Sequence, residues 1–499
     1  MSKRPNIVFI QNDHQAYYHW DWDPEHRPMR PNFEKLASEG AKFTDAYCAS
    51  PLCGPTRRTM LTGLFAHTHG QHHNYTDPPY DHEVYLDTLT EAGYQNYYFG
   101  KWHAGPGAAG EHGCEGFSYT DYGNPYITKE YKEYLEKNNL PEAVHRIEKC
   151  FWVAGISDRG DWDGMEPGAD YKCDAFWCGE HAIGVTTTPK ETHESFFLAS
   201  LACQKLEEIA KSGDDRPFSL RVDFWGPHQP HFPTQEFLDM YPDFHIPKYG
   251  NHEDTLEGKP DTYRRERNVP LGKDDTLIQP SAMAWEDWEV LIRHCFAHET
   301  MIDAAGGMIL DKLRELGLDK NTMIIWTTDH GDGLACHGGH FDKGSYLCEE
   351  TLRIPFAMKW DGVIEAGQVR DELISTVDFP VTLLDAAGLS YTKNEVHGQS
   401  LLPLVKGETN EWREDLMIET MGHGYGDDAW GRAVRYRNWK YIDTREDIEE
   451  LYDLENDVFE LHNLAQNPEY AEILEDMRNR LAKWQKETKD PFCMNGKRF

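Results

Sequence analysis

Short apolar runs recur along most of the chain, and each is bounded by polar or turn-forming residues. Their β-branched and aromatic content is typical of buried strands, which we expect at residues 6–11, 95–99, 218–224, 323–327 and 355–359. Between these runs, apolar residues recur at spacings of three and four, which is the pattern of helices, at residues 31–40, 196–211 and 288–316. Alternating strands and helices predict an α/β fold with a mostly parallel central sheet flanked by helices.

The alternation ends near residue 400, where the sequence becomes highly charged. Strand-like segments follow at residues 416–420 and 432–441, and a helical pattern covers residues 470–486. We therefore predict a main domain over residues 1–400 and a smaller α+β subdomain over residues 401–499. The subdomain should contain a short antiparallel sheet and a terminal helix.

Polar residues follow four of the predicted strands at the point where each strand ends. Asp13 and His14 come after the first, Lys101 and His103 after the second, His228 after the third, and Asp329 and His330 after the fourth. Ligands of open α/β sheets bind beyond the carboxyl ends of the strands. We therefore expect these four polar clusters to converge on one site.

Composition narrows the classes of function that the chain can have. The 499 residues include 50 Lys and Arg against 86 Asp and Glu, a formal net charge of −36 that opposes binding to nucleic acids or anionic lipid surfaces. The 15 Trp, 25 Tyr and 22 Phe exclude a disordered acidic protein. No apolar run is long enough to span a membrane and no export signal is visible at the N-terminus. The eleven irregularly spaced Cys are typical of reduced thiols, so we expect a cytoplasmic protein.

The segment from Cys53 to Gly63 carries the most informative chemistry. Pro55 and Arg57 follow Cys53 at alternate positions, and a helical pattern begins at Pro55. A Cys at the N-terminus of a helix lies at the positive end of the helix dipole, where backbone N–H groups can hold an oxyanion. A buried structural Cys is the simpler alternative. A cysteine phosphatase loop is excluded, because it needs Arg six positions after the Cys and position 59 is Thr59.

The order Cys53-x-Pro55-x-Arg57, followed by Leu61-Thr62-Gly63, resembles the signature of the type I sulfatases of the alkaline phosphatase superfamily. The chain also resembles that family, in the family's order, at residues 6–13, 100–103, 227–230, 329–332, 342–344, 350–355, 398–403 and 450–464. The resemblance implies an alkaline-phosphatase-like sandwich, with residues 1–400 as the sulfatase catalytic domain. It also implies that a formylglycine-generating enzyme converts Cys53 to formylglycine, whose hydrate is the nucleophile.

The resemblance assigns a divalent metal to Asp13, Asp329 and His330, together with a hydroxyl of the hydrated formylglycine at position 53. Calcium is the usual metal of the family, and such a cation lowers the pKa of the attacking hydroxyl and polarises a sulfate oxygen. Arg57 would steady the hydrate and the carboxylates of the metal site.

The remaining roles belong to residues that would touch the sulfate ester. Lys101 and Lys343 would bind sulfate oxygens and offset their charge in the transition state. His228 would protonate or hydrogen-bond the leaving oxygen, and His103 would take the remaining proton of the hydrate so that sulfate is expelled. Asn74 occupies a position where related hydrolases contact the bound anion; it ends the histidine-rich run 67–74, for which we favour structural or substrate-pocket roles over a second metal site.

One residue departs from the family pattern. Family members carry a second Asp after the first, and this chain has His14 there. If His14 is a ligand, the added nitrogen suits manganese, iron or zinc better than calcium. If it points away, Gln15 or water fills the position. Metal dependence is expected in both cases.

The sequence thus predicts hydrolysis of a sulfate monoester, either a sulfated sugar or a small organic sulfate. Aromatic-rich stretches at residues 75–85, 119–134 and 152–177 suit sugar rings or aryl groups. A phosphonate monoester or phosphodiester hydrolase is the nearest alternative, but those enzymes carry Tyr and Thr where this chain has Lys101 and His103. A catalytically silent carbohydrate-binding relative is the other alternative.

Overall fold

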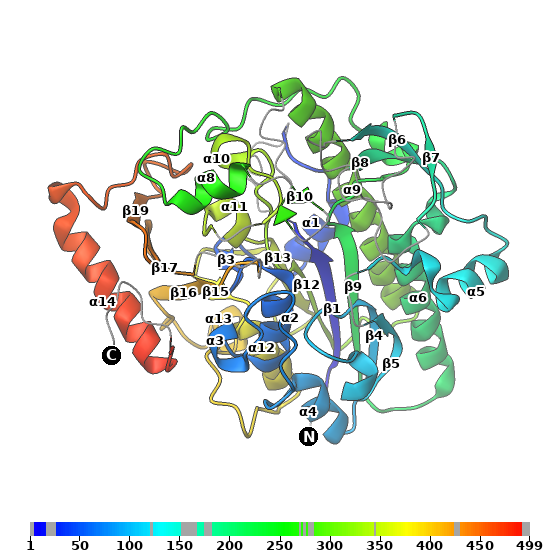
Figure 1. The fold of residues 1–499 in the computed structure, drawn as a ribbon. Coiled ribbons are helices and arrows are strands. Elements are labelled where there is room, and N and C mark those ends of the chain that lie inside the picture. The colour runs from blue at the N-terminus through cyan, green and yellow to red at the C-terminus, as the bar shows by residue number, and fades with distance from the viewer. Residues whose placement is uncertain are drawn as a thin grey trace.

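The computed structural model describes residues 4–15, 26–119, 123–150, 167–173, 182–268, 271–272, 276–277, 284–343, 346–423 and 430–491. An eight-stranded sheet runs through the centre, with strands in the order β14-β2-β13-β12-β1-β9-β4-β5 (Figure 1). In chain order these strands are β1 (Asn6–Asp13), β2 (Ala41–Phe43), β4 (Gln95–Lys101), β5 (Cys114–Tyr119), β9 (Phe218–Pro227), β12 (Thr322–Thr328), β13 (Phe356–Trp360) and β14 (Gln368–Arg370).

The central sheet is mixed, with a single reversed strand. β13 runs antiparallel to both of its neighbours, β12 and β2, whereas the other neighbouring strands pair in parallel. All five strands predicted from the sequence are present. The prediction of a mostly parallel α/β sheet is confirmed.

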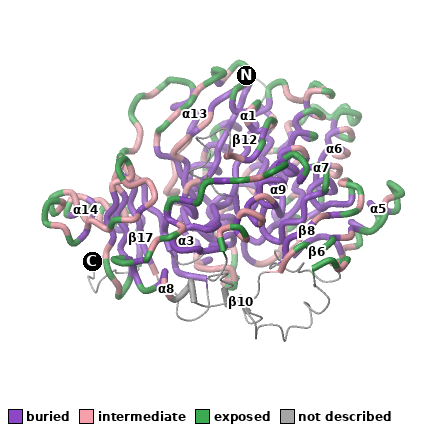
Figure 2. The backbone as a smooth tube through the Cα atoms, turned by 90° about the horizontal axis from the view of Figure 1, so that it is seen from above, coloured by how far each residue is buried: buried purple, intermediate pink, exposed green. Residues whose placement is uncertain are grey.

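Helices cover both faces of the sheet, and the alternation of side chains along β1 shows why. Val8 and Ile10 belong to the core beneath α1 (Pro31–Ser38), α6 (Glu194–Ser212) and α9 (Trp285–Glu315). Ile7 and Phe9 point to the other face and pack with α2 (Cys53–Thr62), α4 (Tyr85–Glu91) and α12 (Asp378–Ala386). Because successive strand residues alternate between faces, a continuous apolar run fits a strand that is covered on both sides. Figure 2 shows the resulting buried interior.

The C-terminal part forms an antiparallel sheet of β16 (Asp415–Thr420), β17 (Gly431–Tyr436), β18 (Trp439–Thr444) and β19 (Glu449–Asp453), followed by α14 (Ala471–Glu487). Leu416 and Ile418 join the core of the main domain, whereas Met417 packs with α14. The small sheet therefore lies between the main domain and its own helix. The boundary at residue 400 stays a prediction.

Two local expectations needed correction. Residues 432–441 form a hairpin and not one strand, because Arg437 adopts a left-handed backbone with φ of 53° between β17 and β18. An Arg is not a typical residue for that conformation, so the turn was hidden in the sequence. The nucleophile helix α2 starts at Cys53 and not at Pro55. Pro is tolerated in a first helical turn because the N–H groups there have no partner within the helix.

Shorter elements complete the described chain. The strands are β3 (Ala46–Tyr47), β6 (His145–Cys150), β7 (Asp170–Tyr171), β8 (Ala182–Thr186), β10 (Leu271–Gly272), β11 (Thr276–Leu277) and β15 (Ile374–Ser375). The helices are α3 (Ala66–His69), α5 (Lys129–Asn138), α7 (Gln235–Leu238), α8 (Asp261–Asn268), α10 (Cys336–Gly339), α11 (Glu349–Leu352) and α13 (Leu402–Val405), and 3₁₀ turns cover Ala109–His112, Pro125–Ile127, Lys190–Thr192 and Pro468–Tyr470.

Two further properties bear on the expected environment of the protein. Among the described helices, none combines the length and the apolar composition needed to cross a bilayer. Eight of the described cysteines are free thiols, as the sequence suggested. Cys173, by contrast, is disulfide-bonded, so the expectation of reduced thiols does not hold for every cysteine.

Candidate active site

The predicted polar clusters meet at one edge of the central sheet. The strands β12, β1, β9 and β4 are consecutive in the sheet and run parallel, so their carboxyl ends lie side by side. β1 ends at Asp13 and β4 ends at Lys101, while His228 and Asp329 directly follow β9 and β12. The convergence expected from the sequence is confirmed.

Cys53 enters this edge from α2, where it is the first helical residue and is buried. Its Sγ lies 3.0 Å from Nε2 of His330 and 3.7 Å from Oδ1 of Asp13. The backbone N–H of Gly54 donates to Oδ1 of Asn74 at 2.9 Å, so this side chain caps the first turn of the helix. Burial raises the pKa of the Cys53 thiol to about 12, which keeps the sulfur protonated at neutral pH.

Asp13, Cys53, Asp329 and His330 form a compact group of donor atoms, all within 4.8 Å of one another. Nδ1 of His330 donates to the carbonyl oxygen of Gly331 at 2.8 Å, which leaves Nε2 directed at the group. A hydrogen bond of this kind fixes the tautomer of a metal-binding histidine. Two carboxylates and one oriented imidazole therefore fit a divalent cation.

Arg57 neutralises the carboxylates around this group. Its guanidinium lies 2.9 Å from Asp329, 3.0 Å from Asp223 and 3.6 Å from Asp13. Burial, followed by the charge of Asp329, raises the pKa of Asp13 to about 6. Burial also opposes ionisation of Asp329, but His330 and Arg57 outweigh it and hold the pKa of that carboxyl well below its usual range. Asp329 is therefore the more readily ionised of the two carboxyl groups.

The two predicted sulfate-binding lysines reach the site from different elements. The ammonium of Lys101 contacts Asp13 and lies 4.5 Å from the centre of the Trp225 ring. Nζ of Lys343 lies 3.0 Å from Oδ1 of Asp342 and 3.3 Å from Nε2 of His228. Gly344, the last residue of the motif at 342–344, lies outside the described residues.

The two predicted proton-transfer histidines are both buried. Burial and the neighbouring lysine charges lower the pKa of His103 and of His228 well below the usual range, so both rings are neutral. Nδ1 of His228 donates to the carbonyl oxygen of Gln229 at 2.8 Å, which directs Nε2 toward Lys343. His103 has a φ of 43°, a backbone conformation that costs about 1–3 kcal/mol and that is typical of functional sites.

The ring of His14 lies beside the donor group and not within it. Its Nε2 is 3.2 Å from Oδ1 of Asp342, and its centroid is 4.9 Å from that of His330. Only its backbone N–H reaches the group, donating to Oδ1 of Asp329 at 2.9 Å. Gln15 does not fill the position either, because its Nε2 donates to Glu299 at 2.8 Å.

Sequence reasoning missed three acidic residues of the site. Asp223 pairs with Arg57 and Arg221, while Asp332 and Asp342 face the ring of His14. A carboxylate inside the apolar run 218–224 was the available signal for Asp223, because buried charges need partners. Asp332 and Asp342 lie in the segments 329–332 and 342–344 that resemble the family, but the sequence assigned neither side chain a role.

The histidine-rich run joins the site to the C-terminal sheet. Nδ1 of His67 lies 2.8 Å from Glu419 on β16, and that carboxylate also pairs with Arg432 on β17. The structural role favoured from the sequence agrees with these contacts.

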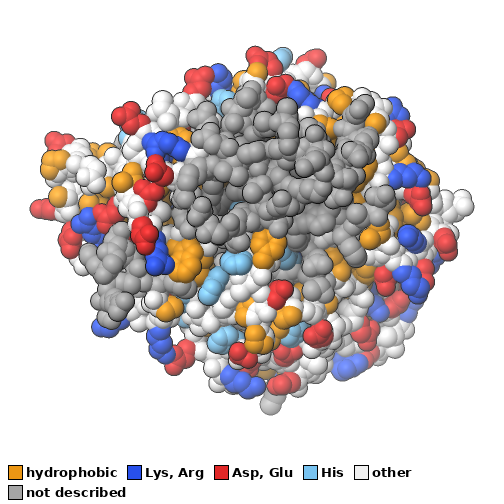
Figure 3. Space-filling model, viewed as in Figure 1, with side chains coloured by type: hydrophobic (Ala, Val, Ile, Leu, Met, Phe, Trp, Pro, Cys, Tyr) orange, Lys and Arg blue, Asp and Glu red, His pale blue; other side chains and the backbone are white. Residues whose placement is uncertain are grey.

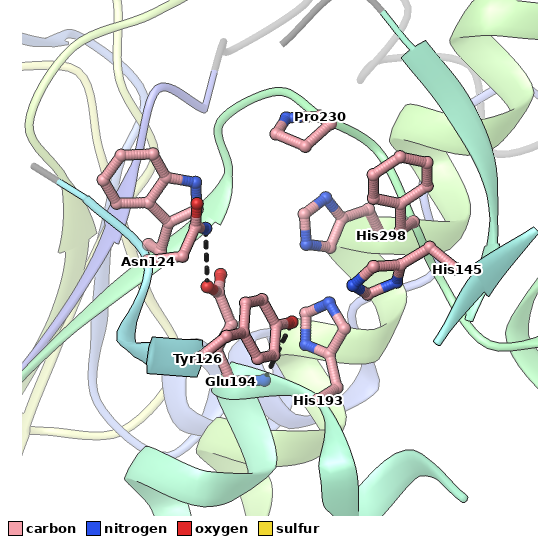
Figure 4. A pocket seen from close by; sticks show the side chains of 9 residues that line it. Asn124, Tyr126, His145, His193, Glu194, Pro230 and His298 are labelled. Atoms are coloured by element: carbon pink, nitrogen blue, oxygen red, sulfur yellow. Dashed lines mark hydrogen bonds between the residues drawn. The ribbon is translucent and has the colours of Figure 1, made fainter. Parts of the chain in front are cut away.

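A small cavity lies behind the lysine side of the site (Figure 4). The volume of this cavity is about 10 Å³, which is roughly the space that one water molecule needs. Glu194 points into it and accepts a hydrogen bond from Nδ2 of Asn124 at 2.9 Å, and the rings of His145, His193 and His298 face the carboxylate across the cavity. Trp225 lines the cavity and also contacts Lys101, so the cavity and the active site share one side chain.

One face of the molecule mixes charges of both signs on its described surface. In Figure 3, Lys and Arg alternate with Asp and Glu, and several His side chains gather near the centre of the face. Most of the aromatic stretch at residues 152–177 lies outside the described residues.

Comparison with protein families identifies the class of protein to which the chain belongs. Residues 5–389 match the sulfatase family model, and residues 336–487 match the model for the C-terminal region of N-sulphoglucosamine sulphohydrolase. The chain belongs to the sulfatase family. It is a sulfuric ester hydrolase, as the motif around Cys53 implied.

Individual relatives match nearly the whole chain. The N-acetylglucosamine-6-O-sulfatase of Bacteroides thetaiotaomicron is 25% identical over 98% of this chain and 88% of that protein. The arylsulfatase of Clostridium perfringens is 27% identical over 96% of this chain and 94% of that protein.

Solved structures confirm the alkaline-phosphatase-like fold. BT4656 was solved in complex with its substrate D-glucosamine-2-N,6-O-disulfate. It superimposes on this chain with a TM-score of 0.73 at 21% identity, and the match covers 99% of this chain and 100% of BT4656. The phosphonate monoester hydrolase of Agrobacterium radiobacter superimposes with a TM-score of 0.75 at 20% identity, covering 97% of this chain and 96% of that one.

Proposed function

We propose that the protein hydrolyses a small sulfate monoester with a formylglycine hydrate formed from Cys53 and one divalent metal held by Asp13, Asp329 and His330. The observation that carries the proposal is the placement of Sγ of Cys53 within 3.0 Å of the oriented Nε2 of His330, at the N-terminus of a buried helix. Inorganic sulfate and an alcohol are the products.

The state of Cys53 in the structure supports its conversion. A thiol with a pKa of about 12 is protonated at neutral pH and is a poor nucleophile. Replacing the sulfur by a hydrated aldehyde would supply hydroxyl groups at the same place. A formylglycine-generating enzyme is therefore the maturation partner that we propose.

The metal, when bound, would lower the pKa of the attacking hydroxyl and offset charge on a sulfate oxygen. Two carboxylates of the donor group favour calcium, and the imidazole of His330 also accommodates manganese or another transition metal. Since neither the ring of His14 nor Gln15 completes the group, the remaining ligands that we propose are a hydroxyl of the hydrate at position 53 and oxygen atoms of water or substrate.

The other residues act on the substrate. Lys101 and Lys343 would donate hydrogen bonds to sulfate oxygens, and His228, whose Nε2 lies 3.3 Å from Nζ of Lys343, is the residue that we propose for contact with the leaving oxygen. His103, neutral and close to the charges of Lys101 and Arg57, accepts the proton of the second hydroxyl as sulfate departs. Asn74 contributes by fixing the helix that carries position 53 and, as a weaker proposal, by contacting the anion.

For the alcohol part we propose a sulfated sugar or a small organic sulfate. The relatives include an N-acetylglucosamine-6-O-sulfatase and an arylsulfatase, which bracket that range. A cytoplasmic location remains a proposal that rests on the free cysteines, and the disulfide at Cys173 weighs against it.

Two measurements test the proposal. Mass spectrometry of the peptide that contains Cys53 should show sulfur replaced by oxygen with the loss of two hydrogens. Turnover of nitrophenyl sulfate should exceed that of a phenyl phosphonate, because Lys101 and His103 stand where phosphonate hydrolases have Tyr and Thr. Faster phosphonate turnover would transfer the assignment to the related hydrolase class, whose fold this chain shares.

A further inference from the structure

A second group of metal-binding side chains lies apart from the active-site group. Cys336, His337, Cys348 and Glu350 are all buried, and their donor atoms lie within 4.8 Å of one another. Both cysteines are free thiols. The family resemblance gives no role to any of these side chains in the reaction.

Outer contacts hold the ligand atoms of this group in place. Oδ2 of Asp254 lies 3.1 Å from Nδ1 of His337, and Nε2 faces both Nδ2 of Asn251 at 3.2 Å and Oε2 of Glu350 at 3.5 Å. Asn251 donates from Nδ2 to Oε1 of Glu350 at 2.7 Å. A carboxylate on the outer nitrogen of a histidine and a hydrogen-bonded carboxylate ligand are the supporting contacts that metal sites in proteins use.

The backbone at His337 and Gly338 is held by hydrogen bonds to Asn251. His337 has a φ of 41°, and its N–H donates to Oδ1 of Asn251 at 3.1 Å. The next N–H, that of Gly338, donates to the carbonyl oxygen of Asn251 at 2.9 Å. One residue from a distant part of the chain thus fixes the turn that presents Cys336 and His337 together.

We propose that Cys336, His337, Cys348 and Glu350 bind a structural zinc ion. Two thiolates, one imidazole and one carboxylate make the four-coordinate, borderline-soft donor set that zinc prefers, whereas calcium and magnesium prefer oxygen alone. Binding forms two Zn–S bonds, one Zn–N bond and one Zn–O bond, and it releases to solvent the two thiol protons and the proton on Nε2 of the His337 ring. A buried, fully protein-enclosed donor set is typical of structural and not of catalytic zinc.

The position of this group in the fold suits an ion that holds the segment around Lys343 in place. Cys336 and Cys348 flank the segment that carries Lys343. On the other side, the carbonyl oxygen of Glu350 accepts from the N–H of Asp332 at 3.0 Å, which ties the group to the segment after Asp329 and His330. Zinc would therefore fasten both ends of the Lys343 segment directly behind the active site. Only this positioning effect rests on the proposed function; zinc binding does not.

Metal analysis of the purified full-length chain tests the site. The protein is prepared without chelators or immobilised metals, and zinc per chain is measured by inductively coupled plasma mass spectrometry. We expect about one zinc per chain in the wild type, in Asp329→Asn and in the control Cys114→Ser, and a loss of that zinc in Cys336→Ser/Cys348→Ser. Zinc-free wild type, or zinc lost with Asp329→Asn and kept in the double serine variant, would overturn the proposal.

A measurement on the wild type covers the case in which the double variant fails to fold. Protein produced with cobalt in place of zinc should show thiolate-to-cobalt charge-transfer absorption and the strong visible bands of a tetrahedral site. Absence of the charge-transfer band, or a disulfide between Cys336 and Cys348 in non-reducing peptide mapping, would refute the site. If the double variant folds, its kcat/KM for the sulfate ester should fall, because Lys343 is displaced, while the active-site metal is kept. These metal readouts are independent of whether Cys53 is converted.

Discussion

Sγ of Cys53 lies 3.0 Å from Nε2 of His330, although the two residues are 277 positions apart in the chain. The contact forms because α2 delivers Cys53 to the carboxyl edge of the sheet at the point where β12 releases His330. Nδ1 of His330 is held by the carbonyl oxygen of Gly331, so the ring cannot turn its Nε2 away without losing that bond. Position 53 is therefore the place where we propose that the nucleophile acts.

Replacing Cys53 by Ala should abolish turnover and leave the fold intact. We expect kcat for a nitrophenyl sulfate to fall by on the order of 10⁴–10⁶, as for other enzymes that lose their nucleophile. The melting temperature should change little, because the Ala fills most of the same buried space. Cys203→Ala, a buried cysteine on α6 outside the site, is the control and should keep full turnover. Retained activity in Cys53→Ala would remove position 53 from the reaction.

Arg57 should be essential for stability as well as for activity. Its guanidinium pairs with the carboxylates of Asp13, Asp223 and Asp329, all of them buried, so Arg57→Ala leaves three carboxylates without their shared cation. We expect the free energy of unfolding to fall by about 3–5 kcal/mol in urea titrations without added metal. Adding Asp329→Asn to Arg57→Ala should recover part of that loss, because Asp329 forms an ion pair with no other Arg or Lys among the described contacts, whereas Asp223 keeps Arg221. Equal or additive losses would contradict this coupling.

Lys343 should contribute to sulfate binding in the transition state. Lys343→Ala should lower kcat/KM by about 10²–10³, the cost of removing one donor to a developing oxyanion. The exposed Lys129→Ala serves as the control, since its side chain is 80% accessible and pairs only with Glu133 along its own helix among the described contacts. A loss smaller than tenfold in Lys343→Ala would place the ammonium outside the substrate site.

The sequence predicted those site residues that directly follow strands of the central sheet. Asp13, Lys101, His228 and Asp329 each follow an apolar run, and a parallel sheet brings the ends of such runs together. The pairing of Arg57 with Asp223 was not predictable, because it depends on which strands are neighbours and which face each side chain takes. Sheet order is a tertiary property that local periodicity does not encode.

The second group of candidate metal ligands could not be predicted from the sequence either. Cys336, His337, Cys348 and Glu350 have none of the regular spacings by which zinc sites are found in sequences. Asn251, which supports this group, comes from a different part of the chain. The backbone N–H of His337 reaches Asn251 because His337 adopts a left-handed backbone conformation. For the same reason the hairpin turn at Arg437 was missed.

His14 should be dispensable for binding of the active-site metal. Its ring faces Asp332 and Asp342 and not the donor group, so His14→Ala should retain the active-site metal, while Asp329→Asn should lose it. Titration of chelator-treated protein with calcium and with manganese, followed by calorimetry, measures the affinity for each ion. A loss of affinity in His14→Ala as large as in Asp329→Asn would make the ring a ligand. In that case the nitrogen-rich site would favour manganese.

Glu194 should make the stability of the protein depend on pH. Burial raises the pKa of this carboxyl to about 8, whereas the unfolded chain has its ordinary value near 4.5. Between these values the folded state holds a proton that the unfolded state lacks, so the stabilisation is complete below the unfolded pKa and is lost as pH rises through the folded pKa. The expected loss is about 1 kcal/mol per pH unit in that window.

Glu194→Gln cannot ionise, and its amide oxygen can still accept from Asn124. Urea unfolding at about pH 5 should give similar stabilities for the wild type and Glu194→Gln, whereas near pH 8 the variant should be the more stable. The neighbouring exposed Glu191→Gln should leave the pH dependence of the wild type unchanged. Parallel stability curves for the wild type and Glu194→Gln would show that the carboxyl ionises normally. The cavity of Figure 4 would then hold enough water to solvate its charge.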